Sequence, residues 1–208
     1  MSVQPRIILT VPHGTCSPIL IGEHYCDFIA EQMGTLLHDA LSKKLNNVSA
    51  QTISYDISLI VEKDIPRSHI DENRDIARQQ HTPFRTKISD SISQSPSGSI
   101  LIDIHSFPNN PEHLESYNTP FYIIDPSIDI FYPANNLSMA LSHTTIPSAA
   151  IFRSGSDEFG QNVNDIIRQA SESGINSTLI EFNEQLTSDG KTRLIERIAN
   201  VIVSIIRK

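Results

Sequence analysis

The stretch Ile100-Leu101-Ile102-Asp103-Ile104-His105-Ser106 decides the fold. Its apolar start is typical of a buried strand, and polar side chains follow where that strand ends. A second apolar run, residues 6–11, leads in the same way into Pro12-His13-Gly14. Ligands and catalytic groups gather at the carboxyl ends of strands in α/β proteins. Two strands that each deliver a histidine there therefore predict a metal site.

Strand-like and helix-like segments alternate along the chain. Hydrophobic periodicity predicts strands at 6–11, 50–55, 100–105, 121–125, 149–152 and 178–182, and helices at 23–45, 74–93, 160–173 and 189–207. Continuous apolar runs such as Ile7-Ile8-Leu9 are typical of central parallel strands that helices cover on both faces. We therefore expect one α/β domain over residues 1–208, with a mostly parallel sheet. The polar segments 106–120 and 126–148 are expected to be irregular, and the first could form part of a substrate rim.

The bulk composition narrows the classes of partner. The chain has 208 residues, a formal net charge of −8 and only two cysteines, Cys16 and Cys26. This acidic balance disfavours nucleic acid and favours a small-molecule or polypeptide substrate. No apolar run approaches the ~20 residues that cross a bilayer, and no secretory leader is visible. We expect a cytoplasmic protein with reduced thiols.

Asp103 and His105 lie two residues apart on one strand and so share a face of the sheet. An aspartate in that position can orient a metal-binding imidazole, and zinc takes imidazole nitrogen readily. The alternative is a buried Asp–His pair with a structural role only. His13, which Gly14 gives room to turn, favours the metal hypothesis.

Two further segments could carry chemistry. The run 65–75 contains Arg67, Asp71, Asn73 and Arg74, and an arginine fork binds a carboxylate with two parallel hydrogen bonds. The alternative is a solvated charged loop. Glu181 lies between large apolar neighbours, where desolvation would raise its pKa, as suits a general base. Alternatively, Glu181 simply marks the end of a strand.

In this order the motifs resemble those of the N-formylglutamate amidohydrolase family of zinc hydrolases and, more distantly, those of zinc carboxypeptidases and aspartoacylases. The resemblance rests on Pro12-His13-Gly14, Arg67-Ser68-His69-Ile70-Asp71-Glu72-Asn73-Arg74, Asp103-Ile104-His105-Ser106 and Glu181. It implies a three-layer α/β/α fold of the phosphorylase/hydrolase-like type.

The resemblance also implies roles for these residues. Zn²⁺ would be held by His13, His105 and an acidic residue, with Asp103 and Ser106 behind the ligands. Glu181 would be the general base, and Arg67 or Arg153 would polarise the scissile carbonyl. Arg74, helped by Asn73, would bind a substrate carboxylate, and Asp71 would belong to the same substrate-binding group by holding Arg74 or Arg67 in place. The implied reaction is hydrolysis of an amide bond in an N-acyl amino acid or at a peptide C-terminus.

The third metal ligand departs from the carboxypeptidase pattern, which has an acidic residue three positions after the first histidine. Cys16 stands there in this chain. We favour Glu23 as the ligand and keep Asp27 as the alternative, because the two lie four residues apart on one face of the predicted helix. Thiolate ligation by Cys16 is a less favoured possibility. Two other functions stay open: a peptidoglycan amidase-like zinc hydrolase, and a degenerate, non-catalytic binding module.

Overall fold

Six strands form one mixed sheet at the centre of the computed structural model, which describes residues 4–14, 26–46, 55–67, 69–107, 121–125, 141, 151–153 and 164–207. The strands are β1 (Arg6–Val11), β2 (Asp56–Val61), β3 (Ile100–Phe107), β4 (Phe121–Asp125), β5 (Ile151–Arg153) and β6 (Asn176–Asn183), in the order β2-β1-β3-β6-β4-β5. The four neighbouring strands β2, β1, β3 and β6 are parallel to one another. Strand β4 runs antiparallel to β6 and parallel to β5. The predicted mostly parallel sheet is confirmed.

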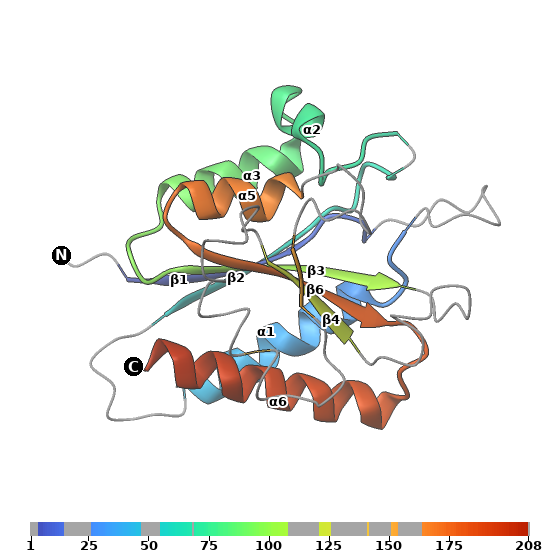
Figure 1. The fold of residues 1–208 in the computed structure, drawn as a ribbon, viewed down its shortest axis with the longest axis vertical. Helices are drawn as coiled ribbons and strands as arrows, with labels where there is room; N and C mark the ends of the chain where they lie inside the picture. Colours follow the sequence, from blue (N-terminus) through green and yellow to red (C-terminus); the bar gives the residue numbers. More distant parts are fainter. Residues whose placement is uncertain are drawn as a thin grey trace.

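Helices cover both faces of the sheet (Figure 1). On one face lie α1 (Ala30–Asn46) and α6 (Ser188–Ile206), and on the other lie α2 (Asp75–Gln79), α3 (Pro83–Ser93) and α5 (Asp165–Glu172). Each face has its own cluster of buried apolar side chains. The three-layer α/β/α architecture is therefore confirmed.

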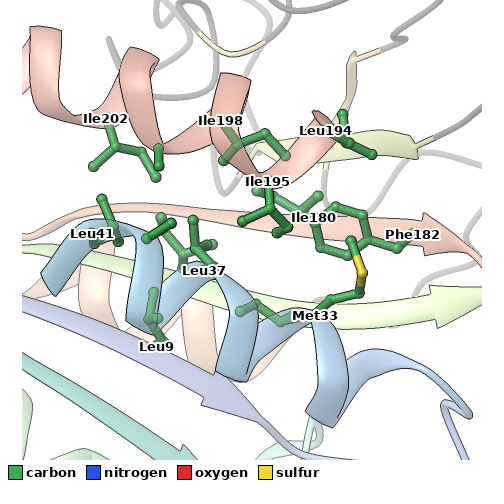
Figure 2. Packing of buried hydrophobic residues seen from close by; sticks show 14 of the residues in the cluster. Leu9, Met33, Leu37, Leu41, Ile180, Phe182, Leu194, Ile195, Ile198 and Ile202 are labelled. Atoms are coloured by element: carbon green, nitrogen blue, oxygen red, sulfur yellow. The ribbon is translucent and has the colours of Figure 1, made fainter. Parts of the chain in front are cut away.

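The larger cluster joins α1, α6 and the sheet. Figure 2 shows Met33, Leu37 and Leu41 of α1 facing Ile195 and Ile198 of α6. All five side chains are buried, because each helix places one apolar stripe at helical spacing toward the other helix and the sheet. Gly34 lies in the same helix, where an added Cβ would come within 3.0 Å of Val11 Cγ2. A small residue therefore allows α1 to approach the sheet closely.

Alternation along the strands separates the polar groups from this larger core. Ile100, Ile102 and Ile104 of β3 belong to the cluster beneath α1 and α6, whereas Leu101 belongs to the cluster beneath α3 and α5. Side chains two residues apart share a face, so Asp103 and His105 follow Leu101 on the α3–α5 face. The polar side chains thus emerge at the carboxyl end of a strand that is buried along its whole length.

Several predicted elements begin later in the chain than expected, among them the helix predicted from residue 160, which begins at Asp165. The strand predicted at 50–55 is β2, which begins at Asp56. This register pairs Arg6 with Asp56, where Arg6 Nε lies 3.4 Å from Asp56 Oδ2, and packs Ile57 and Leu59 on the larger core. The helix predicted from residue 23 begins at Ala30, so Asp27 precedes α1 rather than lying on it.

The helix predicted at 74–93 is two helices. His81 has φ 53°, and Thr82 then caps α3 by accepting a hydrogen bond from Arg85 N. Pro83 opens the second helix, where the missing N–H costs nothing, whereas inside a continuous helix its ring would clash with the preceding turn.

In the part of the chain that the structure describes, no helix is long and apolar enough to cross a membrane.

Candidate metal centre

Two imidazoles and one carboxylate converge at the carboxyl ends of β1 and β3. His13 follows β1, His105 lies near the end of β3, and Asp27 precedes α1. One ligand atom of each lies within 4.8 Å of the other two, and all three residues are buried. Among the described residues this is the one group of three or more metal-ligating side chains so arranged.

The inner nitrogens of both imidazoles face the same carboxylate oxygen. Asp27 Oδ2 lies 2.8 Å from His105 Nδ1 and 3.4 Å from His13 Nδ1. The two rings stand edge to face, with centroids 5.0 Å apart. These close contacts have poor hydrogen-bond orientation, so Asp27 Oδ2 and His13 Nδ1 lie beside partners without making a well-directed hydrogen bond. Buried polar atoms normally have well-directed partners, so this convergent set of nitrogen and oxygen atoms could hold a metal ion.

The outer nitrogens of the same imidazoles are held by other side chains. His13 Nε2 lies 2.9 Å from Asp71 Oδ1. His105 Nε2 lies 3.0 Å from Asp103 Oδ2 and also 3.0 Å from Asn73 Nδ2. A carboxylate behind an imidazole fixes which ring nitrogen carries the proton and turns the other nitrogen toward a metal. The arrangement thus offers the Nδ1 atoms as ligands.

The charges in this cluster shift the pKa of several groups. Burial alone would raise the pKa of Asp27, but His105 and His13 hold it well below its usual range. Burial would likewise lower the pKa of His105, whereas Asp103 and Asp27 raise it well above 6.5. Without a metal ion, the site therefore balances the Asp27 carboxylate with a protonated His105.

Asp71 links His13 to two arginines. Arg74 Nε lies 3.2 Å and Arg67 Nη2 3.6 Å from Asp71 Oδ2, and Arg67 Nη1 lies 4.0 Å from Asp27 Oδ1. Burial would raise the pKa of Asp71, but His13 and the two arginines lower it well below its usual range. The arginine side chains remain 31% and 32% exposed, so each can still receive a solvent-borne anion.

Glu181 lies beside His105 on the neighbouring strand, since β3 and β6 pair these two residues in register. Burial raises the pKa of Glu181 to about 8, with Asp27 and Asp103 adding to the rise and His105 and Arg67 opposing it. Desolvation was the reason to expect a raised pKa from the sequence, and the structure shows that effect.

The backbone that carries Asp27 is fixed by a pair of side chains from the strand ends. Ser106 Oγ donates to Glu184 Oε1 over 2.9 Å, and the same oxygen accepts from Phe28 N over 3.2 Å. Asp27 N itself donates to His13 O over 3.1 Å. Sequence reasoning assigned no role to Glu184, although its place just after a strand that ends at the site was a usable signal.

Thr10 is a second residue that the sequence reasoning missed. Its hydroxyl donates to Asp103 Oδ1 over 2.5 Å, and both residues are fully buried. A lone hydroxyl within the apolar run of β1, beside the polar end of β3, was the available signal. Thr10 pairs with Asp103 in the register of the two strands.

The structure does not place several of the predicted site residues. Glu23 and Cys16 lie outside the described residues, so neither can be placed against the two histidines. Arg153 ends β5, and only its backbone is described. Cys26 is disulfide-bonded, so the expectation of a reduced thiol at that position is wrong.

Comparison with known proteins gives matches in structure alone, since no family model and no curated protein sequence matches the chain. A gene product of Agrobacterium tumefaciens superposes with a TM-score of 0.64 at 16% identity, over 96% of this chain and 91% of that one. The N-formylglutamate amidohydrolase of Ralstonia eutropha gives 0.51 at 15% identity, over 99% and 94%. The N-acetylmuramoyl-L-alanine amidase of Clostridium difficile gives 0.53 at 14% identity, over 100% and 99%. The resemblance predicted from the motifs is therefore confirmed at the level of the fold.

The raised pKa of His105 predicts how the stability of the metal-free protein depends on pH. A group whose pKa is higher in the folded state contributes stability that is fully present below its unfolded pKa of about 6.5 and is lost as the pH rises through the folded pKa. The parent protein should therefore be more stable than His105→Gln, and the difference between their free energies of unfolding should be largest at pH 6. The difference should shrink as the pH rises toward 9. Urea unfolding of both proteins in excess chelator measures it, and a difference that stays constant with pH would contradict the charge balance described above.

Proposed function

We propose that this protein is a zinc-dependent hydrolase that cleaves an amide bond in a substrate with a free carboxylate, either an N-acyl amino acid or a peptide C-terminus. The observation that carries the proposal is that the Nδ1 atoms of His13 and His105 both face Asp27 Oδ2, where neither His13 Nδ1 nor Asp27 Oδ2 makes a well-directed hydrogen bond. Support also comes from the fold, which an N-formylglutamate amidohydrolase and an N-acetylmuramoyl-L-alanine amidase share.

His13, Asp27 and His105 are the residues that would hold the ion. A zinc ion with three protein ligands lowers the pKa of a bound water to about 7 and polarises a carbonyl group. Asp71 and Asp103 would keep the two imidazoles turned toward it from behind. Asn73, which the sequence analysis predicts to bind substrate, has its side-chain Nδ2 3.0 Å from His105 Nε2.

Glu181 is the proposed proton carrier. At a pKa of about 8 its carboxyl is mostly protonated at neutral pH, but positive charge added beside it would lower that pKa. The ionised carboxylate would then take a proton from the attacking water and later deliver it to the leaving amine. A pKa that moves toward the working pH suits both steps.

Arg74 and Arg67 would bind and polarise the substrate. Both guanidinium groups are anchored on Asp71 and keep part of their surface exposed. Arg74 would bind the substrate carboxylate and thereby hold the scissile bond beside His13, Asp27 and His105. Arg67, close to Asp27, would stabilise the developing oxyanion. Arg153 is the alternative for this second role.

A peptidoglycan amidase is the second candidate, because an N-acetylmuramoyl-L-alanine amidase matches the full length of this chain. The exposed arginines beside the ligand cluster favour a small carboxylate over a glycan strand. Parallel assays on N-acyl amino acids and on muramoyl peptides separate the two candidates. Cleavage of muramoyl peptides alone would overturn the preferred one.

The identity of the acidic ligand can be tested directly. Asp27→Ala should lose the bound metal, because it removes the oxygen on which both imidazoles converge. Glu23→Ala is the matched control and should keep about one zinc ion per chain, as should the parent protein. Elemental analysis after purification without chelators gives the ratios. Loss of zinc from the Glu23 variant alone would assign the ligand to Glu23.

Replacing the proposed base should separate chemistry from metal binding. Glu181→Gln should retain zinc but lose about 100-fold or more in kcat, the usual contribution of a positioned acid–base group. Glu172→Gln, an exposed change on α5, is the control and should keep full activity. Turnover of an N-acyl amino acid and zinc content are measured on the same samples. Normal activity in Glu181→Gln would remove that residue from the mechanism.

Arg74 should determine the preference for a free carboxylate. The parent protein should cleave an N-acyl amino acid faster than the matching carboxamide, and Arg74→Ala should raise KM for the acid by roughly tenfold or more while changing the carboxamide little. Steady-state kinetics on the two substrates give both values. An equal effect on acid and carboxamide would show that Arg74 does not bind the carboxylate.

A further inference from the structure

Asn164 occupies the N-terminus of α5, outside every motif that indicated the site. It is the N-cap of that helix, where its side-chain Oδ1 accepts hydrogen bonds from Ile166 N over 3.0 Å and Ile167 N over 3.2 Å. The residue is buried. An N-cap satisfies backbone donors that the helix itself leaves unpaired, and this accounts for the oxygen of the amide alone.

The nitrogen of the same amide is directed at the site. Asn164 Nδ2 donates to Asp103 Oδ2 over 3.0 Å, and this is the oxygen that also lies 3.0 Å from His105 Nε2. The other carboxylate oxygen of Asp103 accepts from Thr10. Asp103 is thus held from two sides, by β1 and by α5, with its remaining contact on the imidazole.

A second connection joins the start of α5 to His105. Asp165 N donates to Asn73 O over 2.9 Å, and the Asn73 side chain reaches His105 Nε2. Arg85, almost fully buried, bridges Asp165 Oδ2 at 2.7 Å and Glu72 O at 3.0 Å. The first residues of α5 therefore fix both groups that face the outer nitrogen of His105.

We infer that Asn164 is a positioning residue for the metal centre, acting on His105 through Asp103. By donating to Asp103 it keeps that carboxylate turned to accept the Nε2 proton of His105, which leaves Nδ1 free to face Asp27 and bind an ion. The inference rests on the proposed metal-binding function. It extends the metal site to the N-terminus of α5, where the side-chain amide of Asn164 must both accept hydrogen bonds from the helix and donate one to Asp103.

An asparagine meets this double requirement where other capping residues do not. Aspartate caps a helix equally well but would place a second carboxylate against Asp103 and has no proton to donate. Serine also caps, yet its shorter side chain cannot serve the helix and reach Asp103 together. Both substitutions preserve the cap and remove the link, so they separate helix stability from positioning.

The test measures zinc affinity for the full-length parent protein, Asn164→Ser and Asn164→Asp by competition with a chelating dye at fixed pH. Both variants should bind zinc about 10- to 100-fold more weakly, the usual effect of losing a partner behind a ligand. Thr187→Ala is the matched control, because Thr187 is an exposed N-cap of α6 that accepts from Gly190 N over 3.1 Å. Its zinc affinity should stay within twofold of the parent while its thermal stability falls.

A spectroscopic readout tests the route of the effect. In zinc-loaded parent protein, ¹⁵N NMR of the histidine rings should show His105 protonated at Nε2, and this signal should shift or broaden in Asn164→Ser. Zinc affinity within twofold of the parent in both Asn164 variants would overturn the inference, as would equal weakening in Thr187→Ala. A parent protein that binds no zinc would overturn the proposed function as well, so the two failures are distinguishable.

Discussion

The rest of the site depends on one buried carboxylate, Asp27, which stands between two imidazoles. A buried charge is costly unless it is paired, and the nearest positive group is His105. Loops and strand ends therefore hold His105 Nδ1 2.8 Å and His13 Nδ1 3.4 Å from the same oxygen, Asp27 Oδ2. The contacts of Glu184 and Ser106 with the start of α1, and the hydrogen bond from Asp27 N to His13 O, meet that requirement.

The sheet places these groups through alternation and register. On β3 the apolar residues that face α1 and α6 alternate with Asp103 and His105, so the polar pair cannot fall into the larger core. In-register pairing then sets Thr10 beside Asp103 and Glu181 beside His105. A shift of one residue would turn every one of these side chains to the opposite face. The same hydrophobic pattern that specifies the sheet therefore also specifies the site.

The sequence predicted the parts of this arrangement that follow from local pattern. Continuous apolar runs located β1 and β3, and the histidines at their ends were visible as exceptions to those runs. The third group was not, because Asp27 reaches the site only through the turn before α1, and a helix predicted from residue 23 led us to favour Glu23. Asn164 carried no local signal beyond that of a helix cap. Its second contact, with Asp103, spans 61 residues and depends on how α5 packs on the sheet.

The two hypotheses for His105, a structural pair with Asp103 or a metal ligand, differ in what they require of its neighbours. A structural pair needs only the outer nitrogen, and here that nitrogen already has Asp103 Oδ2 as its partner at 3.0 Å. It gives no reason for a second imidazole and a second carboxylate to crowd the inner side, where His13 Nδ1 and Asp27 Oδ2 make no well-directed hydrogen bond. A fold that surrounds such atoms with so many oriented partners is better explained by a ligand that satisfies them.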